Sequence, residues 1–140
     1  MSPASETFAK TDHLGDISGR LRGVNIDCMS AMECIDKYDS EEALFYVDPP
    51  YVASTRGRWA QNGYRHEMSE ADHVELLTGL VDWCSAQVIL SGYRNEIYDD
   101  ILSGWTRKDR RTRVNGPGSA VESIWMNEAA VEAQLQMKLL

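Results

Sequence analysis

The residues with the clearest chemical potential are Asp48, Pro49, Pro50 and Tyr51, which directly follow the apolar run of residues 43–47. The run predicts a buried strand that ends at a rigid polar corner. Proline has a fixed φ and no N–H, and a residue before proline is held extended, so the corner offers a carboxylate and backbone carbonyls without competing donors. With an aromatic ring beside it, this acceptor cluster suits an exocyclic amino group on a planar base. A Pro-Pro turn that only closes a core strand is the alternative interpretation.

Hydrophobic spacing and turn residues predict the elements that position this corner. Two serines, Ser30 and Ser69, each precede an acidic residue by three positions, which is the spacing of a capping box at a helix start. The alternation of helices and strands predicts an α/β sandwich with a mainly parallel sheet, the corner strand in its interior, and an antiparallel hairpin at its end. The expected elements are a weak strand at 22–26, a helix from 31 toward 38, the corner strand at 43–47, a helix from about 70 to 84, a short buried strand at 87–90, a helix at about 95–103, a strand pair at 105–114 and 121–126, and a helical tail from 128.

A longer series of residues has a recognisable order and spacing. It consists of residues 45–51, Thr55-Arg56, Tyr64, Glu67-Met68, Asp72-His73, Leu90-Ser91-Gly92-Tyr93, Asn95, Tyr98, Gly104-Trp105 and Glu122-Ser123-Ile124-Trp125-Met126-Asn127. From Leu21 to Asn127 the chain thereby resembles the C-terminal portion of a D12-class (Dam-like) DNA adenine-N6 methyltransferase. The four-residue corner alone is moderately specific, because relatives that act on RNA or on other amines carry similar tetrads.

The resemblance implies a cofactor and roles for particular residues. S-adenosylmethionine would supply the methyl group, and Asp48 and the carbonyl of Pro49 would accept the two hydrogens of adenine N6. Tyr51 would stack on the base after it leaves the duplex. The adenine of the cofactor would lie near Asp27, Cys28 and Met29, with Asp48 close by. Ser91, Gly92 and Tyr93 would line the far side of the pocket, whereas Trp125 is expected in the core.

Two family features do not occur in the sequence. It has no Phe-x-Gly-x-Gly turn for the methionine part of the cofactor, and no acidic strand after such a turn. The implied fold is therefore a partial Rossmann-like S-adenosylmethionine-dependent methyltransferase sheet that lacks its first two strands. The expected organisation is a flexible arm at 1–20, a partial catalytic domain at 21–127 and a helical tail at 128–140. An open strand edge beside the corner would require a homodimer or an N-terminal partner chain.

The net charge of −8 argues against binding of nucleic acid over the whole surface, so DNA binding needs a local basic face. Basic and aromatic residues cluster on both sides of the corner in the sequence. Solvated surface charge is the ordinary interpretation of any single arginine, and phosphate contact is the functional one. The candidates for nucleic-acid contact are Arg56, Arg58, Tyr64, Arg110, Arg111 and Arg113.

The three cysteines, Cys28, Cys34 and Cys84, are irregularly spaced, which predicts neither a disulfide framework nor a metal site. No apolar stretch has the length of a membrane span, and a cytoplasmic location is expected. Three functional interpretations stay open: a DNA adenine methyltransferase, a non-catalytic remnant of one that binds DNA or protein, and an RNA adenine methyltransferase.

Overall fold

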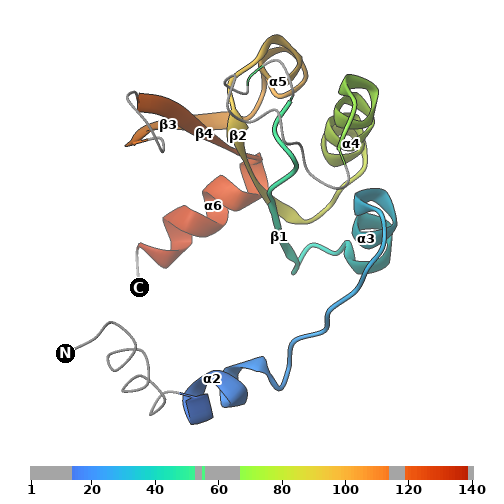
Figure 1. The fold of residues 1–140 in the computed structure, drawn as a ribbon, viewed down its shortest axis with the longest axis vertical. Helices are drawn as coiled ribbons and strands as arrows, with labels where there is room; N and C mark the ends of the chain where they lie inside the picture. The colour runs from blue at the N-terminus through green and yellow to red at the C-terminus, as the bar shows by residue number, and fades with distance from the viewer. Residues whose placement is uncertain (1–13, 53–54, 56–66, 114–118, 139–140) are drawn as a thin grey trace, which may run out of the picture.

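The structure is a computed structural model that describes residues 14–52, 55, 67–113 and 119–138; the side chains of 112, 113, 119 and 120 fall outside the description. Four strands form one sheet, and helices precede, separate and follow them (Figure 1). The elements in chain order are α2 (Leu14–Leu21), α3 (Ala31–Tyr38), β1 (Leu44–Val47), α4 (Glu70–Asp82), β2 (Gln87–Tyr93), α5 (Glu96–Ile101), β3 (Thr106–Arg113), β4 (Ser119–Met126) and α6 (Glu128–Met137).

The sheet has the strand order β1-β2-β4-β3. β1 and β2 run parallel, with Val47 opposite Leu90, whereas β4 is antiparallel to both of its neighbours. The α/β class and the closing antiparallel hairpin are therefore confirmed. The expected mainly parallel sheet is wrong for the described strands, because only one of the three pairings is parallel. β1 also lies at an edge of the described sheet and not in its interior.

The two predicted capping boxes are both present. The Ser30 hydroxyl accepts the backbone N–H of Glu33 at 3.2 Å, and the Glu33 carboxylate accepts the backbone N–H of Ser30 at 2.9 Å. Ser69 and Asp72 repeat the arrangement at α4, with distances of 3.2 and 2.7 Å. Each box satisfies N–H groups that the first helical turn leaves without a partner, so α3 and α4 begin where the sequence predicts.

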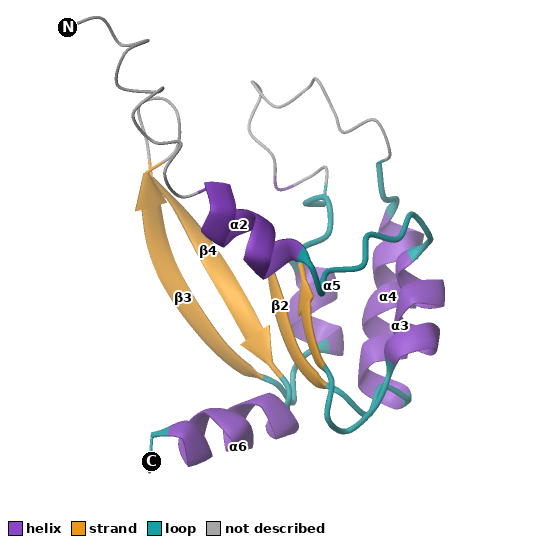
Figure 2. Cartoon of the chain, turned by 90° about the horizontal axis from the view of Figure 1, so that it is seen from below, coloured by secondary structure: helices purple, strands orange, loops and turns teal. Residues whose placement is uncertain are grey.

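The hydrophobic core lies between the sheet and the helices α3, α4 and α5, which gather on one side of it (Figure 2). Leu77 and Leu80 of α4 are buried against Val88 and Leu90 of β2, and Trp125 of β4 is 2 % exposed, as predicted. On β1 only alternate residues join this core, since successive side chains of a strand point to opposite faces. The β1 residues of the other face, Leu44 and Tyr46, are 58 % and 66 % exposed.

The weak strand expected at 22–26 is wrong, because this stretch pairs with no strand among the described residues. Val24 is 53 % exposed and Ile26 is 92 % exposed. Just beyond, the carboxylate of Asp27 accepts hydrogen bonds from Lys37 Nζ at 2.9 Å and from the Tyr38 hydroxyl. These contacts fasten the segment to the end of α3, where no strand offers it a ladder of backbone hydrogen bonds.

Two features concern the ends of the described chain. α2, which falls largely within the segment predicted as an arm, has no buried residue and lies apart from the sheet in Figure 1. The predicted C-terminal helix is present as α6, and Ala130 is buried where α6 meets the sheet. Over the described residues, no helix is both long enough and apolar enough to cross a membrane.

Candidate functional site

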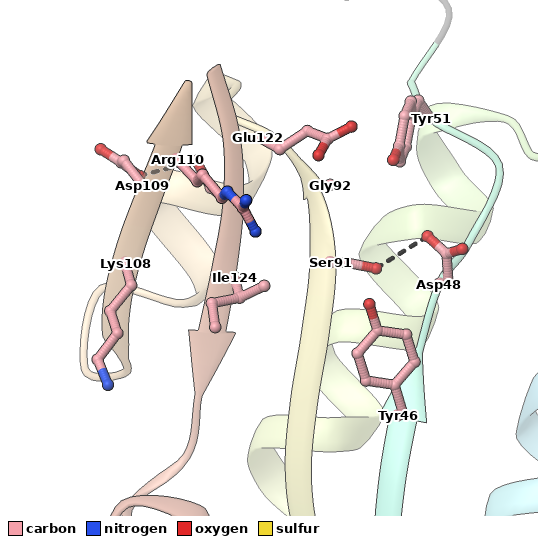
Figure 3. A pocket seen from close by; sticks show the side chains of 11 residues that line it. Tyr46, Asp48, Tyr51, Ser91, Gly92, Lys108, Asp109, Arg110, Glu122 and Ile124 are labelled. Carbon is pink, nitrogen blue, oxygen red and sulfur yellow. Dashed lines mark hydrogen bonds between the residues drawn. The ribbon is translucent and has the colours of Figure 1, made fainter. Parts of the chain in front are cut away.

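The polar corner lies at the carboxyl end of β1, and β2 supports it from one side. The parallel register that pairs Val47 with Leu90 brings the next residues, Asp48 and Ser91, beside each other. The Ser91 hydroxyl donates to Asp48 Oδ1 at 2.8 Å, and its oxygen lies 3.3 Å from the carbonyl of Val47 (Figure 3). Asp48 has no ion pair with another described residue, and Pro49 is buried. A carboxylate is thus held at an exposed strand end, and no described cation neutralises it.

Tyr51 places an aromatic ring next to this carboxylate. Its ring centroid lies 4.5 Å from that of Tyr93 at the end of β2, with an angle of 58° between the two planes. A tilted contact of this kind is a favourable aromatic arrangement. It fixes the direction in which the Tyr51 ring faces the neighbouring cavity, so a flat aromatic ligand there would meet an ordered surface.

A cavity of about 440 Å³ opens beside Asp48 and extends across the sheet from β1 to β3 (Figure 3). Glu122 extends from β4 toward Tyr51 across this space. On the β1 side the cavity is lined by two tyrosines and the Asp48 carboxylate, and on the β3 and β4 side by basic, acidic and apolar side chains. Its lining residues are Tyr46, Asp48, Tyr51, Ser91, Gly92, Lys108, Asp109, Arg110, Glu122, Ser123 and Ile124.

The basic residues of β3 divide according to the alternation of the strand. Arg107 forms ion pairs with Asp99 at 2.9 Å and Asp109 at 3.1 Å, and so belongs to a structural network. Arg110 lines the cavity opposite Glu122 in the register and has no ion pair with another described residue. Arg111 alternates to the other face and does not line the cavity. The predicted DNA contacts Arg110 and Arg111 therefore have different surroundings, since Arg110 lines the cavity and Arg111 does not.

The remaining candidates for nucleic-acid contact cannot be placed in this site. Arg56, Arg58 and Tyr64 lie outside the described residues, as does the side chain of Arg113. Lys108, another basic residue of β3, lines the cavity and donates to Gln134 Oε1 of α6 at 3.0 Å.

A second cavity, of about 260 Å³, lies on the other side of β1 between α3 and α4. It is mainly apolar. Tyr46 and Asp48 line both cavities, so the Asp48 carboxylate lies between them. Its lining residues are Ala31, Cys34, Ile35, Phe45, Tyr46, Val47, Asp48, Pro49, Met68 and Leu76.

The residues expected to hold the cofactor adenine precede α3. Asp27, Cys28 and Met29 line neither of these cavities, although the helix that follows them lines the second one. Hydrogen bonds from Tyr38 and then from Lys37 hold the pKa of Asp27 below its ordinary value. The charged form of this carboxylate is therefore favoured, and its hydrogen bonds go to the end of α3.

Behind the corner lies a buried aromatic layer. Tyr98 is 2 % exposed, its hydroxyl is 3.1 Å from Nδ1 of the buried His73, and its ring packs on Trp125 at 5.2 Å between centroids. Burial, and then the negative charge of Asp48, raise the pKa of the Tyr98 hydroxyl well above its ordinary value. The Tyr98 hydroxyl thus keeps its proton, and the ring packs behind the end of the sheet that carries Asp48.

Sequence reasoning missed part of the cavity lining, including Tyr46, Asp109 and Ile124. Tyr46 could have been found, because residues two positions apart in a strand share a face and Asp48 is its neighbour by that rule. Asp109 and Ile124 depend on the pairing of β3 with β4. For metal ions the structure offers no candidate: in the described ranges no three His, Cys, Asp or Glu side chains gather as ligands.

The site thus combines a carboxylate–proline corner with an adjacent aromatic ring at the carboxyl end of a strand in an α/β fold, an arrangement suited to the amino group of a planar base. The family model of D12 class N6 adenine-specific DNA methyltransferases matches residues 4–115 of the 140-residue chain. The chain therefore belongs to this family, whose members act on DNA. No curated protein matches the chain.

Proposed function

We propose that this chain transfers a methyl group from S-adenosylmethionine to the N6 nitrogen of adenine in DNA, with the Asp48–Tyr51 corner as its reaction centre. The observation that carries the proposal is the position of the Asp48 carboxylate. It is unpaired by any described cation, bonded to Ser91, and placed between an apolar cavity and a larger one with both polar and aromatic walls. Family membership supports the choice of base and of DNA as substrate.

For this reaction the corner must make adenine N6, a poor nucleophile, more reactive. The lone pair of adenine N6 is delocalised into the ring, so N6 attacks a carbon weakly. Asp48 and the backbone carbonyl of Pro49 would accept the two N6 hydrogens, which favours a tetrahedral nitrogen with a localised lone pair. The new N–C bond would form as the S–CH3 bond of the sulfonium breaks and S-adenosylhomocysteine is released. Positive charge would develop on N6, where the Asp48 carboxylate stabilises it, and one N6 proton would then leave to solvent.

The larger cavity suits the adenine. Tyr51 would stack on one face of the base, which replaces the stacking that the base loses when it leaves the duplex. Such an aromatic face is worth about 1–3 kcal/mol per base in proteins that bind single strands. Arg110, on the opposite wall of the cavity, supplies a cation for the sugar–phosphate side of the same nucleotide.

The smaller cavity fits the adenosine half of the cofactor. Its walls include the apolar side chains of Ile35, Phe45 and Met68, and Asp48 and Pro49 also line it. S-adenosylmethionine supplies an activated methyl group when bound, and no metal ion is required. We also propose that Asp27, Cys28 and Met29 contact the cofactor adenine, because they directly precede the N-cap of α3.

The remaining DNA contacts are proposed on charge and sequence position. Arg56, Arg58 and Tyr64 follow the corner in the chain, and Arg111 and Arg113 follow Arg110 along β3. Phosphate contacts by such residues would orient the duplex without specifying its sequence. The overall charge of −8 makes this local basic region the natural entry for DNA.

The free edge of β1 supports a partner for the sheet. Among the strands that the structure describes, Leu44–Val47 is hydrogen-bonded to β2 on one side only, and it carries no charged residue. We propose that a strand from a second polypeptide, either another copy of this chain or an N-terminal partner chain, pairs with this edge. Such pairing would remove the exposed backbone groups that edge strands present.

The test is to measure binding of S-adenosylmethionine to the 140-residue chain by calorimetry, followed by transfer of labelled methyl to unmethylated duplex DNA. Micromolar binding and label at adenine N6 are expected. Binding without transfer, or DNA binding without the cofactor, would identify a non-catalytic remnant instead. A parallel reaction with a duplex RNA of the same sequence separates DNA from RNA, since greater transfer to RNA would reassign the substrate.

A further inference from the structure

The Asp48 carboxylate receives one hydrogen bond from the described part of the protein, and it comes from Ser91. Its two oxygens therefore have different surroundings. Oδ1 is bonded to the Ser91 hydroxyl at 2.8 Å, whereas Oδ2 has no hydrogen bond from a described residue. An aspartate at the end of a strand can rotate freely about its side-chain bonds unless a partner holds it, so the choice of which oxygen faces the cavity depends on this bond.

The hydroxyl of Ser91 is itself held by two acceptors. Its oxygen lies 2.8 Å from Asp48 Oδ1 and 3.3 Å from the carbonyl of Val47, and a hydroxyl has a single proton to donate. The shorter distance and the charge of the carboxylate favour donation to Asp48, since hydrogen bonds to charged groups are the shorter and stronger ones. The backbone of Ser91 is paired with Ile124 of β4, and the preceding residue, Leu90, is paired with Val47 of β1.

We propose that Ser91 is a positioning residue that fixes the Asp48 carboxylate with Oδ2 directed to the adenine N6 hydrogen. The inference rests on the proposed function for its substrate, but the arrangement of Ser91 and Asp48 is independent of it. Ser91 touches no reacting atom in this scheme; it acts through Asp48 alone. A residue of this kind lowers the reorganisation that the carboxylate would otherwise undergo when the base arrives.

The supporting structure is rigid on the side away from the cavity. Gly92, the next residue, has no side chain, and a Cβ built there would lie 3.4 Å from Tyr98 Cε1 and 3.8 Å from Trp125 Cζ3. The strand therefore packs closely on the buried Tyr98–Trp125 pair, which leaves Ser91 little freedom to withdraw from Asp48. Ser91 lies on the opposite face of the strand and lines the cavity.

Three variants separate positioning from simple structural support. Ser91→Ala removes the hydroxyl, Ser91→Cys keeps nearly the same shape with a much weaker donor, and Ser91→Thr keeps the hydroxyl. Ser103→Ala, an exposed serine in the turn after α5, is the matched control. Thermal unfolding of each variant shows whether the fold is kept, and only folded variants are compared.

The first measurement is the ¹³C chemical shift of the Asp48 carboxyl carbon at neutral pH in the chain labelled at aspartate. The Ala and Cys variants are expected to move this resonance, whereas the Thr and Ser103 variants leave it near its original position. An Asp48 resonance that does not move in Ser91→Ala would overturn the proposal. This result is independent of whether the chain methylates DNA.

The second measurement is the methyl-transfer rate at saturating and at low cofactor. The Ala and Cys variants are expected to lower kcat about tenfold to a hundredfold, the loss typical of a hydrogen bond to a charged group, with little change in KM for S-adenosylmethionine. Ser91→Thr should restore most of the rate. Equal rates in all variants of an active chain would refute the positioning role, while an inactive wild-type chain would count against the proposed function and leave the ¹³C result to decide on Ser91.

Discussion

The two edges of the sheet differ in a way that locates the site. The β1 edge consists of Leu44, Phe45, Tyr46 and Val47 and carries no charge. The β3 edge spans Thr106–Arg113, in which five of eight residues are basic and one is acidic. Charged side chains on an edge strand prevent it from pairing with other strands. Among the described strands, charge therefore protects the β3 edge of the sheet, whereas the β1 edge is uncharged and unpaired and leads directly to the Asp48–Tyr51 corner.

A pair of aspartates repeats the contrast. Asp109 on β3 accepts the Ser123 hydroxyl at 2.8 Å, as Asp48 accepts that of Ser91 at the same distance. Asp109 also pairs with Arg107 at 3.1 Å, which neutralises much of its charge. Asp48 has no such partner among the described residues. A serine bond orients both carboxylates, but only the one at the β1 end keeps its charge available for a ligand.

The strongest test of this contrast is Asp48→Ala. Removal of the unpaired carboxylate is expected to lower methyl transfer about a thousandfold, because it takes away the main stabilisation of the charge that develops on N6. Thermal unfolding should change little, since Asp48 is exposed and makes one hydrogen bond within the described chain. Initial rates with labelled cofactor on unmethylated duplex DNA measure the effect.

The control for Asp48→Ala is Asp99→Asn. Asp99 is the acidic residue between Arg94 and Arg107, at 2.7 and 2.9 Å, and lies away from the cavity. Exposed ion pairs contribute about 0–1 kcal/mol each, so the variant should remain folded and keep its rate within about threefold. A rate that survives in Asp48→Ala, or falls equally in both variants, would remove the distinction between the two carboxylates.

The next test places a charge on the open edge. Leu44 is 58 % exposed and lines neither cavity at the corner, so Leu44→Lys changes the edge without altering their walls. The wild-type chain is expected to exceed its monomer mass in light scattering at high concentration, and the variant to return to the 15.8 kDa monomer. Thr106→Lys on the already charged β3 edge is the control and should not change the mass. A monomeric wild-type chain would exclude pairing between copies and leave an N-terminal partner chain as the candidate.

Much of this arrangement was accessible from the sequence. Local signals predicted the start of α3 and α4, since Ser30 and Ser69 cap their helices through contacts only three residues apart. The closing hairpin also followed from alternation and turn residues. Such features depend on neighbours in the chain, which a sequence displays directly.

The errors concern contacts between distant segments. Residues 22–26 have the alternation of a strand, yet a strand forms only where another edge is beside it, and the described chain provides none there. Likewise, the separation of Arg110 from Arg107 depends on where Asp99 and Asp109 lie in space. The sequence identified the tetrad, but the bond from Ser91 to Asp48 requires the parallel register of β1 and β2.

A smaller effect, on the free energy of unfolding, is expected from a change at Asn127, which directly follows β4. The Asn127 side chain accepts the backbone N–H of Val88 at 3.0 Å and that of Ala130 at 3.0 Å, and donates to the carbonyl of Ala86 at 2.8 Å. It therefore joins the start of β2 to the cap of α6.

Asn127→Ala should lower the free energy of unfolding by about 2–3 kcal/mol, because backbone groups lose their partners. Asn95→Ala, which removes the cap of α5, should cost about 1 kcal/mol, and chemical denaturation compares the two. Equal losses would contradict the bridging role of Asn127.

On the β1 side, Asp39 fastens the end of α3 to the start of β2. Its carboxylate accepts the backbone N–H of Ser85 at 3.0 Å, the Ser85 hydroxyl at 2.8 Å and the backbone N–H of Ala86 at 2.9 Å. The Ser85 N–H is the main reason that the pKa of Asp39 lies below its ordinary value, and partial burial opposes it. A carboxylate with a lowered folded-state pKa stabilises the fold above its ordinary pKa of about 3.9, and this stabilisation is lost as the pH falls through the lowered value.

The smallest predicted effect is therefore a change in the acid limb of the stability curve. Asp39→Asn keeps a side-chain oxygen as acceptor but cannot titrate, so its unfolding free energy should fall less steeply than that of the wild-type chain below about pH 4. Asp27, Glu33 and Asp72 also have lowered pKa values and retain a slope in both proteins, so the difference between the two curves isolates Asp39. Denaturant unfolding between about pH 3 and pH 7 measures it. Parallel curves would mean that Asp39 does not hold the β1 side through its charge, and the contrast between the two sides would then rest on Asp48 alone.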